Sequence, residues 1–451
     1  MGAMEFGKVA LLLMLVTVSY GYADENGNLG KKFVLLVAGS NGWHNYRHQA
    51  DVSHAYQLVR GNGIPAENII VMMYDDVANH TSNPTPGTLI NRPDGSDVYK
   101  GIKIDYWGDD VNTDVFFSVL KGNKGGVKGV GSGRVIESGP HDNIFIYYAD
   151  HGSTGFVCFP NELLYADQLI KALNEMYIRR KYKKMLLYIE ACESGSMFDG
   201  LLAEDKAILA VTASGPRESS WACYCEEDSS GYDTCLGDLF SVTWMEDLDN
   251  HTVADDSRSV FNQFQKVRTA VQYSNVMVYG DFHVGHNKLY SFVGHPANNV
   301  NLGKSPDKYS PKTYQSRSVV SSRDIYEKSI SAEISLTTDL IKQKLLEEEL
   351  HLYSKTKTFI NHVLRTIYTK LISEIPKIAA EIGEYDNTAP LQLTMNAFPC
   401  YRNILDNISE KCFSIPKNSY ALDKLAFLAN ICIVDNSLDK KLLEFVDNIC
   451  V

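Results

Sequence analysis

Short runs of consecutive apolar residues recur in the first part of the chain, and segments with apolar residues at helical spacing separate them. The apolar runs cover residues 32–39, 68–74, 143–149, 184–190 and 207–213. Continuous aliphatic and aromatic runs indicate strands that are buried on both faces of a parallel sheet. The helical segments cover residues 47–62, 112–120, 165–180 and 237–249. This alternation predicts an α/β fold, with an open, mostly parallel sheet and helices on both of its faces.

The pattern changes after residue 296. Residues 297–335 are rich in Asn, Ser, Lys and Pro without apolar periodicity, which predicts an exposed linker. Apolar residues then return at helical spacing, without strand signals, at Ile341, Leu345, Leu346, Leu350, Ile360, Val363, Leu364, Ile367, Leu371 and Ile372. We therefore expect an α/β domain over residues 24–296, a linker over 297–340 and an all-α domain over 341–451.

The first 23 residues have the pattern of a secretory signal peptide. Lys8 precedes an apolar stretch at residues 9–18, and the small residue Ala23 offers a cleavage site. This stretch is too short to span a bilayer, and no later run is long enough, so we expect no membrane span. Three glycosylation sequons, at Asn79, Asn250 and Asn407, agree with passage through the secretory pathway.

The nine cysteines divide by region. Cys400, Cys412, Cys432 and Cys450 form an even set, which in an oxidising compartment predicts two disulfides with three possible connectivities. In the first half, Cys225 and Cys235 could close a small ring, next to Cys223. No histidines stand at ligand spacing near these cysteines, so we expect neither a zinc site nor any other metal or cofactor.

The charge is unevenly distributed. The chain carries a formal net charge of −12. Residues 301–451 hold 19 basic and 19 acidic residues, so the first 300 residues carry the whole excess. An acidic domain without a basic stripe argues against nucleic acid as a partner.

Two of the expected strands each deliver one reactive side chain at their carboxyl end. His151 follows the run that ends at residue 149, and Cys192 follows the run that ends at residue 190. An imidazole beside a thiol favours the nucleophilic thiolate, and the amides of Gly152 and Cys192 could bind an oxyanion. Considered alone, Cys192 would be interpreted as a buried core cysteine and His151 as a hydrogen-bonded histidine in a turn. Their joint position at neighbouring strand ends favours catalysis.

Several stretches in the same order resemble the asparaginyl endopeptidases, or legumain family, of the C13 cysteine peptidases. The stretches are VAGSNGWHNYRHQADVSHAYQ, NPTPGTLINRPDGSDVY, FIYYADHGSTG, YIEACESGSMF and PRESSWACYC, and the resemblance covers essentially the whole chain after the signal peptide. It implies a caspase-like catalytic domain, a helical C-terminal prodomain and cleavage of peptide bonds after asparagine. It also implies that Cys192 is the nucleophile, His151 the general base and Asn45 the residue that orients the imidazole.

The resemblance further implies a polar pocket that reads the residue before the scissile bond. Its members are Arg47, His48, Glu190, Ser219 and Asp238, and Asp150 matches the aspartate that can cyclise to a succinimide. A carboxamide suits such a pocket because it offers one acceptor to Arg47 and two N–H donors to carboxylates. Aspartate suits it only when protonated, which requires acid. Without the resemblance, a structural ion-pair network is an equally good reading of these charges.

The family's prodomain acts as an inhibitor, so the chain is expected to be a zymogen that cuts itself in acid. Candidate cleavage points are Asn298, Asn299, Asn301, Asp324 and Asp339. Protonation of carboxylates in the acidic domain is expected to weaken the cap. Other implied partners are protein substrates with asparagine and cystatin-type inhibitors, and the implied locations are a lysosome, an acidic vacuole or an acidic lumen outside the cell.

The sequence departs from the family pattern in two places, and two alternative functions stay open. Residues 120–123 replace the Arg-Gly-Asp tripeptide of many mammalian members, and the loop that holds Cys225 and Cys235 is longer than usual. The same acyl-enzyme could serve a peptide ligase if an amine captured it in place of water. A catalytically inactive binding protein is the alternative from another class, whereas the related lipid-anchor transamidase is expected to carry a C-terminal membrane helix.

Overall fold

The computed structural model describes residues 30–93, 95–225, 231–250, 257–295 and 318–450. The expected signal peptide and the candidate cleavage points Asn298, Asn299 and Asn301 lie outside these ranges. In the described part of the chain, no helix is both long and apolar enough to cross a membrane.

A six-stranded sheet forms the centre of the α/β domain, in the order β11-β8-β7-β3-β1-β2. Its strands are β1 (Lys32–Ala38), β2 (Ile69–Met72), β3 (Asn143–Ala149), β7 (Lys184–Glu190), β8 (Ile208–Thr212) and β11 (Met277–Gly280). All neighbours pair in parallel except β11, which is antiparallel to β8. The sequence predicted the five parallel strands, and it missed the antiparallel edge strand.

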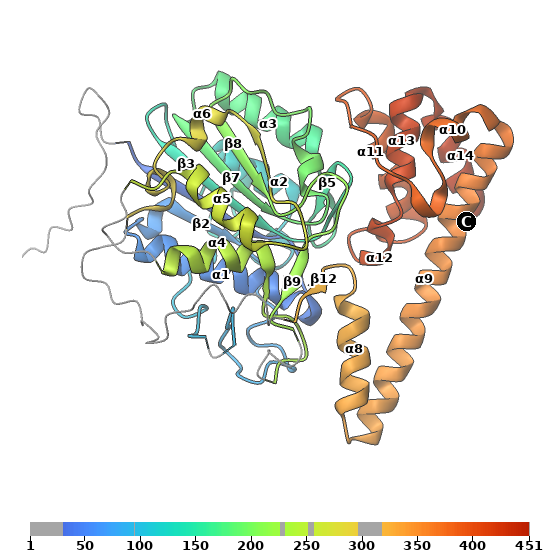
Figure 1. The fold of residues 1–451 in the computed structure, drawn as a ribbon, viewed down its shortest axis with the longest axis horizontal. Helices are drawn as coiled ribbons and strands as arrows, with labels where there is room; N and C mark the ends of the chain where they lie inside the picture. Colours follow the sequence, from blue (N-terminus) through green and yellow to red (C-terminus); the bar gives the residue numbers. More distant parts are fainter. Residues whose placement is uncertain (1–29, 94, 226–230, 251–256, 296–317, 451) are drawn as a thin grey trace, which may run out of the picture.

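Helices cover both faces of this sheet (Figure 1). Along β1, Val34 and Leu36 pack with α1 (Tyr46–Gly61), α4 (Leu239–Asp249), α5 (Val260–Ala270), and the short α6 (Phe282–Gly285) and α7 (Tyr290–Val293). Leu35 and Val37 point to the opposite face, where α2 (Thr113–Lys121) and α3 (Ala166–Ile178) pack. Because successive strand residues point to opposite faces, one continuous apolar run supplies both cores. The predicted α/β class with helices on both faces is therefore confirmed.

Two small antiparallel sheets stand beside the central one. The first contains β4 (Gly152–Ser153), β5 (Phe156–Cys158) and β6 (Leu163–Tyr165). The second contains β10 (Gly237–Asp238), β9 (Trp221–Cys223) and β12 (Val320–Ser321). The Cys225–Cys235 disulfide lies beside this second sheet and packs with Val320 and Ile325.

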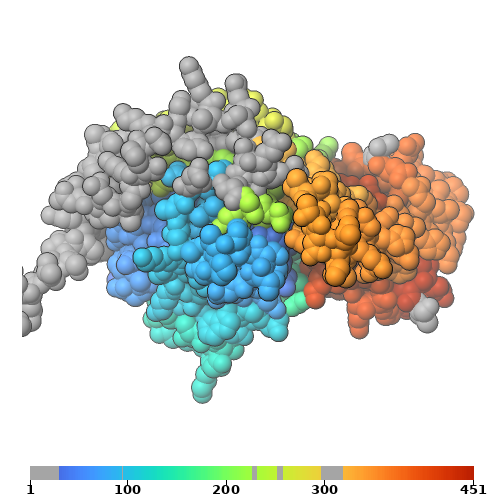
Figure 2. Space-filling view, turned by 90° about the horizontal axis from the view of Figure 1, so that it is seen from below, coloured from blue at the N-terminus to red at the C-terminus, as the bar shows by residue number. Residues whose placement is uncertain are grey.

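The C-terminal region is helical, as predicted. It consists of α8 (Ile325–Leu336), α9 (Leu340–Glu374), α10 (Ala379–Ile382), α11 (Phe398–Lys411), α12 (Ser419–Leu422), α13 (Ala426–Val434) and α14 (Asp439–Ile449). Disulfides join Cys400 to Cys432 and Cys412 to Cys450, so the four cysteines adopt one of the three connectivities. Figure 1 shows α8 and α9 as a long antiparallel pair, and Figure 2 shows this pair against the N-terminal part of the surface.

The helical region packs directly on the α/β domain through the first small sheet. The ring of Tyr401 lies against Phe156, with ring centroids 6.4 Å apart. Ser153 donates a hydrogen bond to the carbonyl of Leu422 at 2.6 Å, and Tyr165 donates one to Asp406 at 2.7 Å. The helical region therefore covers one edge of the α/β domain.

The structure differs from the expected exposed linker over residues 320–336. Val320 pairs with Ala222 as part of β12, and the side chains of Val320 and Ile325 are buried. Ile330 on α8 is also buried. The sequence pattern did not reveal this burial because the segment contains too few apolar residues to produce a periodic apolar face. The linker prediction is wrong for this part.

Candidate active site

Cys192 and His151 lie at the carboxyl ends of adjacent parallel strands. β3 and β7 pair in register up to Ala149 and Glu190, and the amide of Asp150 then donates to the carbonyl of Glu190 at 3.0 Å. A Cβ atom on Gly152 would come within 2.5 Å of the Cys192 carbonyl oxygen, so only glycine permits this close approach. The fold therefore brings together the two reactive residues that the sequence singled out.

Asn45 fixes the tautomer of His151. Nε2 of His151 lies 2.7 Å from Oδ1 of Asn45, and Nδ2 of Asn45 donates to the carbonyl of Asn41 at 2.9 Å. Because Nδ2 of Asn45 is the donor to Asn41, its oxygen faces the imidazole and accepts a proton from Nε2. Nδ1 of His151 is therefore the basic nitrogen.

The thiol and the imidazole are both buried and uncharged in the full-length chain. Burial raises the pKa of the Cys192 thiol, against the opposing charge of Arg323. Burial, together with the charges of Arg47 and Arg323, lowers the pKa of His151 well below its ordinary value. Sγ of Cys192 accepts a hydrogen bond from the amide of Ser220 at 3.3 Å.

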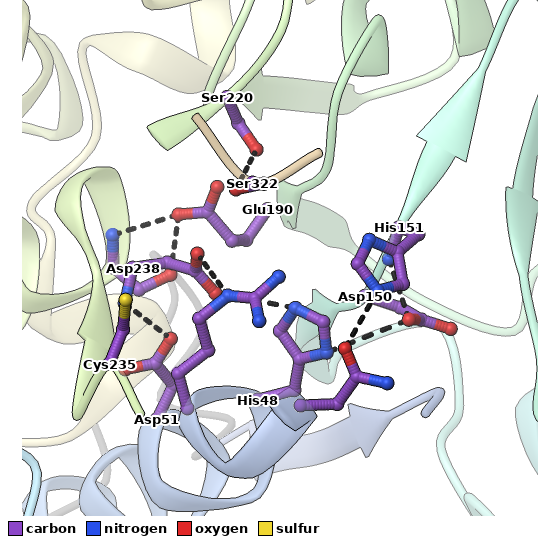
Figure 3. A network of polar contacts seen from close by, with 12 residues as sticks. His48, Asp51, Asp150, His151, Glu190, Ser220, Cys235, Asp238 and Ser322 are labelled. Carbon is purple, nitrogen blue, oxygen red and sulfur yellow. Dashed lines mark hydrogen bonds and ion pairs between the residues drawn. The ribbon is translucent and has the colours of Figure 1, made fainter. Parts of the chain in front are cut away.

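Figure 3 shows a polar cluster that extends from Glu190 and Asp238 to His48, next to His151. Nε of Arg47 donates to Oδ1 of Asp238 at 2.9 Å, and Nη1 donates to the carbonyl of His44 at 3.1 Å. Oε2 of Glu190 accepts from the amide and the hydroxyl of Ser241 at 3.1 and 2.8 Å. The first-turn residues of α1 and the ends of β7 and β10 thus position the three charged side chains.

Among the described residues, three buried atoms of this cluster lack a hydrogen-bond partner. They are Nη2 of Arg47, Oε1 of Glu190 and Oδ2 of Asp238. Burial raises the pKa of Asp238, and the neighbouring Arg47, Asp51 and Ser322 oppose this rise. One donor and two acceptors therefore lack hydrogen bonds, and Oδ2 of Asp238 has only the His48 ring 3.5 Å away.

His48 links the cluster to the catalytic pair. Nδ1 lies 2.6 Å from the Ser40 hydroxyl, Nε2 lies 3.5 Å from Oδ2 of Asp238, and the ring stands edge-on to that of His151. Burial, with the charge of Arg47 next to it, lowers the pKa of His48 well below its ordinary value. His48 is therefore a neutral spacer between the two halves of the site.

The buried carboxyls repel one another. Burial and the charge of Asp238 raise the pKa of Glu190 and of Asp51 well above their usual values. Burial also raises the pKa of Asp150, whose Oδ1 accepts from the amide of His151 at 2.6 Å. This contact places the amide nitrogen next to the carboxyl carbon that a succinimide ring would join.

The sequence analysis missed two residues that hold the carboxylates of this cluster. Asp51 accepts from the amide of Asp238 at 3.1 Å, and Ser241 holds Glu190. Ser220 is buried beside Cys192 and Ser322. The residue before it, Ser219, which the resemblance assigns to the pocket, is half-buried. Asp51 follows Arg47 by one helical turn, a spacing that could have indicated it.

The remaining candidate residues lie away from this cluster. Asn79 and Asn250 are exposed, as a sequon requires, whereas Asn407 is half-buried within α11. Asp324 and Asp339 are exposed residues at the starts of α8 and α9. Neither aspartate lies in the pocket, which instead faces Ser322.

A thiol, a neutral imidazole of fixed tautomer and an adjacent pocket on an α/β sheet define the site of a cysteine peptidase. Comparison with known proteins agrees. Residues 32–295 match the model of the Peptidase C13 family, and the chain belongs to this family.

The relatives have legumain-type names. The chain is 40% identical to mouse legumain over 98% of this chain and 99% of the relative, and 40% identical to human legumain over 95% of each. It is 49% identical to a vacuolar-processing enzyme of Citrus sinensis over 60% of this chain and 56% of the relative. The chain is thus a cysteine endopeptidase that acts on peptides or proteins.

A solved structure of caspase-1 from Spodoptera frugiperda matches 60% of this chain and 92% of its own, with a TM-score of 0.34 and 11% identity. The sheet order described above, rather than this likeness, defines the fold class.

Proposed function

We propose that the protein is the zymogen of an endopeptidase that cleaves after asparagine. The observation that carries this proposal is the set of three unpaired buried atoms in the polar cluster. Buried polar groups are normally paired, so an unpaired group calls for an explanation, and a ligand that supplies the partner is one such explanation. A structural ion-pair network, the alternative reading, would satisfy these atoms within the protein.

The three atoms complement a carboxamide. Nη2 of Arg47 can donate to the amide oxygen, while Oε1 of Glu190 and Oδ2 of Asp238 can each accept one N–H. An apolar side chain would leave all three unpaired, and sites of this kind reject such analogues by about 10⁴-fold. An ionised aspartate would face two carboxylates, so cleavage after aspartate requires its protonated form.

The catalytic steps follow from the tautomer of His151, in which Nδ1 is the basic nitrogen. Nδ1 of His151 takes the proton of the Cys192 thiol, and the thiolate attacks the carbonyl carbon of the asparagine. The oxyanion is stabilised by the amides of Gly152 and Cys192. The tetrahedral adduct collapses, the C–N bond breaks, and His151 returns its proton to the leaving amine. Water, deprotonated by His151, then hydrolyses the thioester.

In the full-length chain, the C-terminal region acts as the inhibitor. Ser322 lies at the pocket, where its amide donates to the Ser220 carbonyl at 3.1 Å, and the helical region covers the edge of the domain. In the covered chain, burial raises the pKa of Cys192 and lowers that of His151, while the charge of Arg323 opposes the rise at the thiol. Removal of the cover would rehydrate the pair and favour the thiolate.

The relatives' names support an acidic compartment such as a vacuole or lysosome. Self-cleavage at the candidate asparagines and aspartates, inhibition by cystatin-type proteins, and peptide ligation by the same acyl-enzyme stay predictions of the resemblance.

The test is a set of matched peptides that differ only in the residue before the scissile bond. We expect Asn to exceed Gln and Leu by at least about a hundredfold in kcat/KM, since each missing hydrogen bond to a buried charged group is unfavourable. Mass spectrometry of the products at acid and neutral pH reports the cleavage position and any ligation. Equal cleavage after Leu would refute the proposal.

A further inference from the structure

Residues 320–323 lie along the active site as an extended peptide. Val320 pairs with Ala222 and Ser321 with Trp221 in antiparallel register, and the amide of Ser322 continues the ladder to the Ser220 carbonyl. Ser322 therefore lies where the proposed function puts asparagine. The next residue, Arg323, then lies on the side of the leaving group.

Arg323 is held mainly by the α/β domain. Its guanidinium forms an ion pair with Glu193, and Nη2 donates to the carbonyl of Gly152 at 3.1 Å. The side chain is only 8% exposed. Two weaker contacts come from the helical region: Nη1 to the Ser419 carbonyl at 3.4 Å, and Nε to Oδ1 of Asp423 at 3.9 Å. The two closer partners belong to the part that carries Cys192.

The backbone holds Glu193 in an unfavourable conformation beside the nucleophile. Its φ is 49°, in the left-handed region that residues other than glycine rarely adopt. The amide donates to the Glu218 carbonyl at 2.8 Å, and the carbonyl accepts from the Ser196 hydroxyl at 2.6 Å. Such local strain persists where the surroundings fix it, commonly at functional sites. The catalytic steps described above do not use this carboxylate.

We propose that Glu193 and the Gly152 carbonyl form a subsite that selects arginine or lysine immediately after the scissile bond. This inference rests on the proposed function, because it assigns the substrate residue that follows the asparagine. A cation at this position makes a charge-assisted hydrogen bond to Glu193 and a second one to the carbonyl. A neutral residue leaves the carboxylate without a counter-ion. Arg323 is the internal occupant of the same subsite.

Three peptides test the subsite, each with asparagine followed by arginine, citrulline or alanine. Citrulline matches arginine in shape but carries no charge. The full-length protein is activated until it cleaves the Asn–Ala peptide, and kcat/KM is measured at about pH 8, above the pKa of about 7 that Glu193 has in the full-length chain. We expect the arginine peptide to exceed the citrulline peptide about tenfold, as a hydrogen bond between charged groups allows.

The same ratio in Glu193→Gln assigns the effect to this carboxylate. We expect the ratio to fall to about one, and because it is measured within one enzyme, any general loss of activity cancels. Equal rates for arginine and citrulline in the unaltered protein would overturn the subsite but not the proposed function. A preference that survives in Glu193→Gln would also overturn it. If no activation treatment yields a protein that cleaves the Asn–Ala peptide, both the subsite and the proposed function are overturned.

Discussion

Nε2 of His151 and Oδ1 of Asn45 lie 2.7 Å apart, and this contact determines which imidazole nitrogen is the base. Asn45 sits at the start of α1, with its own amide group held by the Asn41 carbonyl. The helix that carries Arg47 into the pocket thus also orients the imidazole. In the proposed function, substrate binding and catalysis therefore share one helix.

Asn45→Ala should lower kcat by roughly tenfold to a hundredfold while KM changes little, because a base in the wrong tautomer loses part of its contribution. The kinetic constants are measured with an asparagine peptide. Gln57→Ala is the control on the same helix, since its side chain points to the Val98 carbonyl and away from the site. A change confined to KM would contradict an orienting role.

Cys192→Ser should fold as the full-length chain and lack peptidase activity, because a serine hydroxyl is far less readily ionised than a thiol. Cys158→Ala is the matched control, since Cys158 is also a buried free cysteine. We expect the control to keep its activity after activation. Activity above a few per cent of the unaltered enzyme in Cys192→Ser would show that another residue is the nucleophile.

Glu190→Gln should reduce cleavage after asparagine by about a hundredfold or more, because it replaces a charged acceptor with a group that can also donate. The variant should unfold at nearly the same temperature, since glutamine can still accept from Ser241. Both kcat/KM and the melting temperature are measured. A loss of stability with normal cleavage would mean that the cluster is a structural network.

The sequence predicted those parts of the molecule that depend on local pattern. Apolar runs located the parallel strands, and their ends located Cys192 and His151, because side chains at the carboxyl ends of parallel strands meet at one edge. The sequence could not predict that residues 320–323 occupy this edge. Their pairing with β9 joins segments about a hundred positions apart, and nothing local in the segment encodes it.

Acid is expected to weaken the packing of the helical region on the α/β domain. Protonation of Glu193 has the opposite effect. Burial in the covered chain raises the pKa of Glu193 to about 7, despite the ion pair with Arg323. A carboxyl whose pKa rises on covering binds its proton more tightly when covered, so protonation of Glu193 favours the covered state. Asp423 behaves in the opposite way, because Arg323 and Lys424 lower its pKa. Its contribution to the stability of the covered state is therefore lost only in stronger acid.

Ser322→Asn should turn the inhibitory segment into a substrate. The residue at the pocket would then carry the carboxamide that the three unpaired atoms complement. We expect the purified variant to be cut after residue 322, which N-terminal sequencing detects as a new end at Arg323. The matched control is Ser321→Asn, one position earlier, whose side chain should miss the pocket because neighbouring strand residues point to opposite sides.

An intact bond after residue 322 in the Ser322→Asn variant, under conditions where asparagine peptides are cleaved, would mean that the segment is not bound as a substrate. Cleavage of both variants at the same rate would mean that the cut occurs only after the segment has left the site. Combining Ser322→Asn with Cys192→Ser should abolish the cut if the protein cleaves itself.

The stability of the full-length chain should rise as the pH falls from about 8 to about 6.5, where ordinary carboxyls do not yet titrate. Asp51, Asp150 and Glu190 have pKa values raised well above those of the unfolded chain, and that of Glu193 is raised to about 7. Glu193 in the folded state therefore takes up a proton in this window and an ordinary glutamate of the unfolded chain does not, which favours folding at lower pH. The histidines of the unfolded chain, with an ordinary pKa of about 6.5, protonate in the lower part of this window, and buried neutral histidines then oppose the trend.

Calorimetry of the Cys192→Ser protein measures this dependence without self-cleavage. We expect the melting temperature to increase by several degrees across the window and to level off below it, since His48 and His151 have lowered pKa values in the folded chain. Glu193→Gln should reduce the slope, because one of the carboxyls that takes up protons is gone. A melting temperature that falls between pH 8 and 6.5 would show that these carboxyls are already protonated throughout, or are ionised and stabilised by Arg47 and Arg323.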